Sequence, residues 1–224
     1  MKLSENTVEV LKNFSTINPS LSFRQGNVLR TVSPQKNILA SSVVEETFPV
    51  DFAIYELNQF LGLNSIFENG DISFGEKGLE ISEGSSKCSY TYTDPSMVTS
   101  PPEKDLSLPT KEVQFEMSRD TLKSVVNAAN QLSLPEISVR GDGTSISLVA
   151  TDTKNPTTNE YSVSVSSTHA EAPLEEFSLV FKTENFKFIP DDYSVTVSSK
   201  GISNFKGERV EYWVATEAGS SYGS

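Results

Sequence analysis

In each half of this chain, the spacing of apolar residues first follows a helical period and then a strand-like period. LSENTVEVLKNF at 3–14 and MSRDTLKSVVNA at 117–128 align without gaps, and their apolar residues recur three and four positions apart. This spacing predicts one amphipathic helix in each half. Ser4 and Ser118 stand where N-cap residues are favoured. The predicted apolar faces consist of Val8, Leu11 and Phe14 or Ser15 in the first helix, and Leu122, Val125, Val126 and Ala129 in the second.

After each helix the apolar positions alternate, which predicts β-strands. SLSFRQGNVLRTVS at 20–33 predicts one hairpin. EISVRGDGTSISLVATD at 136–152 predicts a clearer one, with Gly141-Asp142-Gly143 as its turn. Further alternating runs lie at 67–75 and 79–93 in the first half and at 160–167, 192–199 and 210–216 in the second.

A second, shorter helix is predicted within the strands of each half, at 56–63 and 182–188. These segments lie 126 residues apart, whereas the opening helices lie 114 apart, so the halves share an order of elements but differ in loop length. Such a repeat is typical of a duplicated domain. The predicted fold class is α+β, with antiparallel sheets and two helices in each of two similar domains.

Four prolines between residues 93 and 112 predict an extended connector between the domains. The expected division is therefore a first domain at 1–93, the connector at 94–111, a second domain at 112–217 and a flexible tail at 218–224.

The composition of the chain limits which partners and which cellular compartment we expect. The chain has 18 Lys and Arg against 30 Asp and Glu, a net charge of −12, which argues against coating nucleic acid by bulk attraction. No apolar run is long enough to span a membrane, so no membrane partner is expected. A polar, charged start predicts no secretory signal, and the single Cys88 favours a reducing, cytosolic setting.

No recognisable catalytic constellation occurs in the sequence, so we expect no enzyme activity, no cofactor and no metal site. His169 is the one histidine, and no G-x-S-x-G, H-E-x-x-H or C-x-x-C motif or phosphate-binding glycine loop accompanies it. We interpret His169 as an exposed loop residue, and Asp191-Asp192 as turn residues after Pro190.

Four segments, in the same order over nearly the whole chain, resemble the sliding clamps of large tailed bacteriophages, which are DNA polymerase processivity factors. They are MKLSENTVEVLKNFSTIN at 1–18, DFAIYELNQFLG at 51–62, DPSMV at 94–98 and FKGERVEYWVATEA at 205–218. The resemblance implies a homotrimeric, pseudo-symmetric ring of six like domains around double-stranded DNA. It also implies contacts with a clamp loader ATPase complex, the C-terminal peptide of the replicative polymerase and late-transcription factors, in the cytoplasm of an infected bacterium.

Cations on one stripe of the second predicted helix are the best candidates for DNA contact. Arg119 and Lys123 lie opposite its apolar face, and the matching positions in the first half are Glu5 and Glu9. Exposed lysines suit loose phosphate contact that ignores base sequence. The predicted DNA-facing residues are Lys12, Arg119, Lys123, Lys182 and Lys187. Ordinary solvated helix faces remain the alternative.

The connector and the last strand are expected to bind partner peptides. Alternation in VEYWVAT predicts that Val210, Tyr212 and Val214 face the core while Trp213 faces outward. The predicted groove residues are Met97, Val98, Leu106, Leu108 and Trp213. Two other classes stay open: a non-enzymatic structural or virion protein rich in β-structure, and a hydrolase or carbohydrate-binding module with a pocket that joins His169 to acidic residues.

Overall fold

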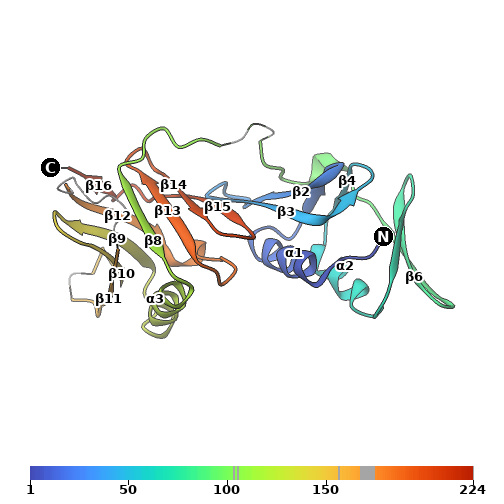
Figure 1. Ribbon diagram of the computed structural model, residues 1–224, viewed down its shortest axis with the longest axis horizontal. Helices are drawn as coiled ribbons and strands as arrows, with labels where there is room; N and C mark the ends of the chain where they lie inside the picture. Colours follow the sequence, from blue (N-terminus) through green and yellow to red (C-terminus); the bar gives the residue numbers. More distant parts are fainter. Residues whose placement is uncertain (103, 105, 156, 167–174, 224) are drawn as a thin grey trace. The chain divides into compact units, whose positions relative to one another are not determined.

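The computed structural model (Figure 1) describes residues 1–102, 104, 106–155, 157–166 and 175–223. The chain divides into two compact units, Met1–Lys104 and Asp105–Ser224, and the boundary falls within the predicted connector. Both units combine helices with antiparallel sheets, so the structure is α+β as the sequence predicts. Among the described residues, no helix has the length and apolar character needed to cross a membrane.

The described residues of unit 1 form two α-helices, one 3₁₀ turn and seven strands. In chain order they are α1 (Glu5–Ile17), β1 (Leu21–Phe23), β2 (Gly26–Val32), β3 (Ile38–Phe48), β4 (Phe52–Ile54), α2 (Leu57–Asn64), β5 (Asp71–Phe74), β6 (Gly78–Glu83), β7 (Ser86–Thr91) and η1 (Pro95–Met97). Antiparallel pairs join β1 to β4 and β2 to β3, and β5, β6 and β7 form a three-stranded sheet in that order. Helix α1 packs against α2 and β3.

In unit 2 the part of the chain that the structure describes forms one α-helix, one 3₁₀ turn and nine strands. They are β8 (Val113–Met117), α3 (Arg119–Gln131), β9 (Glu136–Asp142), β10 (Ile146–Thr151), β11 (Tyr161–Val165), β12 (Glu176–Lys182), η2 (Thr183–Asn185), β13 (Tyr193–Ser198), β14 (Ile202–Lys206), β15 (Glu211–Ala215) and β16 (Ser221–Tyr222). One sheet has the order β11-β10-β9-β12-β16, and β15-β14-β13-β8 follow one another in a second. Helix α3 packs on β9, β10 and β11.

The two predicted opening helices are confirmed, and so are their caps. The Ser4 hydroxyl accepts a hydrogen bond from Thr7 N at 3.2 Å, and the Ser118 hydroxyl accepts one from Thr121 N at 3.1 Å. In α3 the predicted Leu122, Val125 and Ala129 are buried, and Val126 is half-buried. In α1 the buried stripe is wider than predicted: Thr7, Val10, Leu11, Phe14 and Ile17 are buried, while Val8 is half-buried.

The hairpin predicted at 20–33 is wrong. Strand β1 pairs with β4 instead, and β2 pairs with β3. The Asp51 carboxylate holds the turn between β1 and β2, because it accepts a hydrogen bond from Gln25 N at 2.7 Å and pairs with the Arg24 guanidinium at 3.1 Å. The Phe23 ring stacks on Phe52 of β4, with centroids 4.4 Å apart, which favours this partner for β1.

The helix predicted at 56–63 is confirmed as α2, but the one predicted at 182–188 is wrong, since only the single turn η2 forms there. Phe186 and Phe188 are both buried, and residues two positions apart lie on nearly opposite sides of a helix, so one helix face would not bury both. The segment is instead fixed by an aromatic cluster in which the Phe188 ring stacks on Tyr212 at 4.5 Å. Ile189 N donates to the Tyr212 hydroxyl at 3.0 Å.

The structure also corrects two smaller predictions, the position of a turn and the flexibility of the tail. The second hairpin is confirmed as β9–β10, but Gly141 lies inside β9, and the turn spans Asp142 to Ser145. The Asp142 carboxylate accepts hydrogen bonds from Ser145 N at 2.7 Å and Thr144 N at 2.9 Å, which keep its pKa well below the usual range. The tail expected to be flexible contains β16, whose Tyr222 ring stacks on Phe177 of β12.

Candidate nucleic-acid and peptide interfaces

The exposed face of α3 carries the two cations predicted from the sequence. Arg119 and Lys123 are exposed, together with Asn127 and Asn130, on the side away from the buried Val125. The Arg119 backbone N donates to Asp192 Oδ1 at 2.7 Å, so a carboxylate lies beside the first turn of this helix. The stripe therefore offers two cations and two amides that can contact phosphates without reading bases.

A groove of about 700 Å³ lies beside the C-terminal half of α3 and brings in the other two predicted cations of unit 2. Lys182 and Lys187 line it together with Val126 and Asn130 of the helix. Lys154, which the sequence reasoning missed, lies in the same groove. Its position in the polar loop between two predicted strands was the only signal that could have indicated it.

Acidic residues offset much of this positive charge. Glu136, Asp152, Glu184 and Glu217 also line the groove, and Lys182 Nζ lies 3.9 Å from Glu184 Oε1. Three lysines and four carboxylates leave the groove close to neutral. Such a surface suits contacts to DNA that are weak and easily exchanged rather than a tight anion site.

In unit 1 the predicted Lys12 is exposed on α1, but Glu5 and Glu9 are exposed on the same helix. The structure thus places Lys12 in a mixed-charge environment, as the sequence comparison of the two helices indicated. Helix α1 therefore exposes one cation beside two carboxylates, whereas α3 exposes two cations.

The residues predicted to contact partner peptides differ in exposure. Val210, Tyr212 and Val214 are buried, which confirms the alternation in β15, and Trp213 is half-buried on the other face. Met97 is 63% exposed in η1, whereas Val98 is buried within unit 1. Leu106 and Leu108 are half-buried. Val98 therefore anchors the start of the connector, and the accessible predicted residue in unit 1 is Met97.

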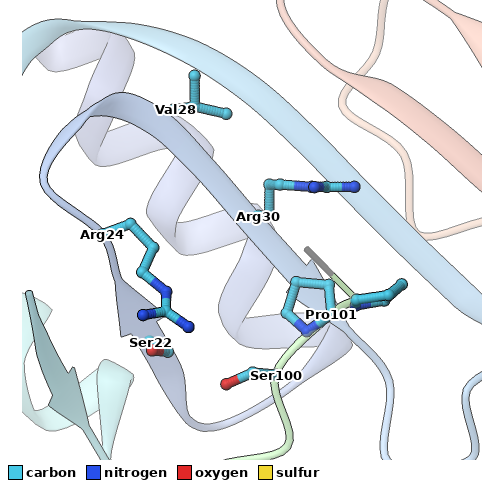
Figure 2. A pocket seen from close by; sticks show the side chains of 7 residues that line it. Ser22, Arg24, Val28, Arg30, Ser100 and Pro101 are labelled. Carbon is cyan, nitrogen blue, oxygen red and sulfur yellow. The ribbon is translucent and has the colours of Figure 1, made fainter. Parts of the chain in front are cut away.

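A pocket that the sequence reasoning did not single out lies where the connector begins (Figure 2). It measures about 370 Å³ and lies against the outward side chains of β1 and β2. Its lining residues are Ser22, Arg24, Val28, Arg30, Ser100, Pro101 and Pro102. The signal was present in the sequence, since Arg24, Val28 and Arg30 alternate with the apolar Phe23 and Leu29.

Two observations concern the expectation that the protein has no catalytic or metal site. His169 lies outside the described residues. Among the residues that the structure describes, no group of three or more His, Cys, Asp or Glu side chains could hold a metal ion. Asp191 and Asp192 lie between the bend at Pro190 and β13, and Asp192 N donates to the Asp191 carboxylate at 2.9 Å.

Comparison with known proteins covers nearly the whole chain. Residues 2–99 match the family model described as DNA polymerase processivity factor, and residues 114–218 match gp45 sliding clamp, C terminal. The sliding clamp of Vibrio phage KVP40 is 34% identical over 225 residues, spanning 97% of this chain and 100% of the relative. That of Enterobacteria phage T4 is 27% identical, spanning 99% of both.

Solved structures show the same fold at low identity. Proliferating Cellular Nuclear Antigen from Entamoeba histolytica superposes with a TM-score of 0.68 at 14% identity, covering 94% of each chain. A. fulgidus PCNA, solved with the C-terminal region of FEN-1 bound, gives a TM-score of 0.69 at 16% identity over 98% of each chain. These likenesses concern the fold alone.

Proposed function

The chain belongs to the sliding-clamp family of DNA polymerase processivity factors, and we propose that it forms a homotrimeric ring that encircles duplex DNA and tethers its phage's replicative polymerase. The observation that carries the DNA-binding part is the exposed stripe of α3, with Arg119 and Lys123, beside the groove of Lys154, Lys182 and Lys187. Lys12 of α1 is the candidate contact in unit 1.

The charge distribution supports sliding rather than tight binding. A chain with a net charge of −12 repels DNA overall, so any attraction must come from local cations. In a trimer each of these cations would occur three times around the duplex. Because they are exposed and partly offset by carboxylates, each contact is weak and screened by salt. We expect retention to be independent of base sequence, because exposed lysines and arginines contact mainly phosphates.

The proposal includes partners that the family resemblance implies. They are a clamp loader ATPase complex that opens the ring, the C-terminal peptide of the polymerase, and late-transcription factors, all in the cytoplasm of the infected bacterium. Met97, which is exposed, and Trp213, which is half-buried, are proposed for peptide contact, together with the half-buried Leu106 and Leu108 of the connector. The protein contributes binding and tethering and performs no catalysis itself.

The test is retention on primed circular DNA of the variant Arg119→Glu/Lys123→Glu. At low salt we expect its half-life on DNA to be about tenfold shorter than that of the wild type, because a trimer would carry six reversed charges. Lys200→Glu/Lys206→Glu is the matched control, since both lysines are exposed in unit 2 and lie outside α3 and its groove. A variant that assembles normally and is retained like the control would show that α3 does not face DNA.

A further inference from the structure

A short segment at the end of unit 2 covers one edge of its five-stranded sheet (Figure 1). The strand order is β11-β10-β9-β12-β16, so β12 would be the outermost strand if β16 were absent. Strand β16 consists only of Ser221 and Tyr222, which lie opposite Ser178 and Phe177 of β12. Residues 217–223, which we call the strap, therefore run along an edge that is seven residues long.

The strap forms hydrogen bonds with the outward backbone groups of β12. Val180 N donates to the Ser220 hydroxyl at 2.9 Å, and Val180 O accepts from Glu217 N at 2.7 Å. Glu176 O accepts from Gly223 N at 3.1 Å. Because the backbone groups of successive strand residues point to alternate sides, every second residue of β12 faces the strap rather than β9. Without the strap these groups would be open to another chain.

Few contacts hold the strap beyond these backbone hydrogen bonds. The Tyr222 ring stacks on Phe177, with centroids 5.8 Å apart, while Ser221 is exposed. Gly223 ends the strap with a φ of +64°, in the left-handed region that favours glycine. A strand of two residues offers another chain little to pair with, which is one way in which natural sheets protect an edge.

The sequence of β12 makes it a strand that needs such cover. EFSLVFK at 176–182 contains Phe, Leu and Val, no Gly or Pro, and one acidic and one basic side chain. Segments with high β-propensity and low net charge readily pair with other strands when their edge is exposed. The strap therefore covers an edge that would otherwise favour association.

Strand β12 is also complementary to itself. Two antiparallel copies that meet about a two-fold axis at Leu179 would place Glu176 of each copy opposite Lys182 of the other, and Phe177 opposite Phe181. In this register the hydrogen-bonded pairs use the backbone groups that now face the strap. Opposite charges and aromatic rings that face each other across a strand pair are stabilising. The partner that fits the uncovered edge is therefore β12 of a second copy.

We propose that the strap blocks pairing of two copies through β12, and that its displacement lets the copies join antiparallel about Leu179. In the folded chain the strap occupies the position that the strand of the second copy would take, so the contact is autoinhibitory. The inference does not rest on the proposed function, because it applies whether or not copies of the chain also close into a ring.

The experiment measures mass by light scattering for a chain that ends at Ala218, which lacks β16 and the Ser220 hydroxyl. We expect its average mass to be at least about twice that of the wild type at the same micromolar concentration. Full-length Ser220→Ala/Tyr222→Ala weakens the strap without deleting it, and should associate in the same way at higher concentration. Circular dichroism shows whether each variant is folded. If the folded variants keep the wild-type mass, the proposal is overturned.

Charge changes test the register of the pair. In the shortened chain, Glu176→Lys sets like charges opposite each other at both ends of the pair, so the concentration for half-association should rise about tenfold. Glu176→Lys/Lys182→Glu makes the charges opposite again and should restore association. The same changes in the full-length chain are the control, and should leave its mass unchanged because the strap covers β12. Association that ignores both changes would show non-specific aggregation and overturn the proposal.

The mass of the wild type tests the proposed ring separately. A monomeric wild type whose shortened form pairs as described would contradict the ring and support the strap. A trimeric wild type whose shortened form keeps the same mass would support the ring and overturn the role of the strap.

Discussion

At the scale of single residues, the carboxylate of Glu46 joins β3 to the first turn of α1. One oxygen accepts a hydrogen bond from Ser4 N and the other from the Thr7 hydroxyl. Glu46 is 9% exposed, and burial alone would raise the pKa of its carboxyl, but the hydrogen bonds from Thr7 and Ser4 outweigh burial and lower it. The charged form of Glu46 is therefore the one that stabilises the folded unit.

We predict that Glu46→Gln lowers the free energy of unfolding by about 2 kcal/mol at pH 7, because an amide replaces two charge-assisted hydrogen bonds. A carboxyl group with a lowered folded-state pKa adds stability above its ordinary pKa of 4.5 and loses it as pH falls through the folded value. The difference between wild type and variant should thus be constant near neutral pH and shrink below about pH 4.5.

Urea unfolding between pH 3 and pH 7 measures this difference, with the exposed neighbour Glu45→Gln as the control. A difference that remains constant down to pH 3 would contradict the role of the charged carboxylate. The sequence predicted the caps Ser4 and Ser118 because each bonds within its own turn. It could not predict Glu46, because the partners are 42 and 39 residues away along the chain.

At the scale of elements, Gly141 and Phe177 fix how β9 and β12 pack. The two residues face each other across the strand pair, and a Cβ atom on Gly141 would lie 2.2 Å from Cε1 of the Phe177 ring. The glycine is needed for space rather than for a turn. This is why the sequence placed the turn one residue too early: a glycine in a G-D-G run is typical of turns as well as of close packing.

We predict that Gly141→Ala lowers the free energy of unfolding by about 2 kcal/mol, as overpacking of a buried site typically does. Gly219→Ala, where an added Cβ would meet nothing within 4 Å, should change it by less than about 0.5 kcal/mol. Combining Gly141→Ala with Phe177→Leu should cost less than the sum of the single changes, since the smaller side chain relieves the clash. Thermal unfolding of the four variants checks this, and additive costs would refute the contact.

Elements whose signals are local were predictable, and those that depend on distant partners were not. Helices α1, α2 and α3 and the β9–β10 hairpin carry their periodicity and caps within a few residues. Strand β1 was assigned to the wrong partner because the Phe23–Phe52 contact joins residues far apart in sequence. The helix predicted at 182–188 failed for the same reason, since its phenylalanines pack on Phe205 and Tyr212.

At the scale of the whole molecule, the internal repeat predicted the α+β class. In the described residues of both units a helix is followed by four strands, but unit 2 adds β8 before its helix and has the turn η2 where unit 1 has α2. The repeat also predicted the exposed cations of α3. Alternation in the sequence indicates that Arg24 and Arg30 face outward. Neither the pocket around them nor the groove with Lys154 could be predicted, because each is formed by loops and strands that only the fold brings together.

The outermost strands of the sheets are relevant to how copies of the chain assemble. In the part of the chain that the structure describes, β7 is an outermost strand in unit 1 and β11 an outermost strand in unit 2. Outermost strands expose unpaired backbone N–H and C=O groups that invite pairing with another chain. Two different edges on one chain suit head-to-tail contact, which closes into a ring when the rotation per subunit permits. Because the chain belongs to a family with two similar domains, we expect its copies to close into such a ring.

We predict a solution mass of three chains of 24.5 kDa each, about 74 kDa, by light scattering at micromolar concentration. Dilution should shift the mass downward in a single step from trimer to monomer, because a ring that loses one contact also loses the closure that held the other two. A mass of 24.5 kDa at every concentration would contradict the proposed ring. It would also contradict the explanation that the ring gives for retention on DNA.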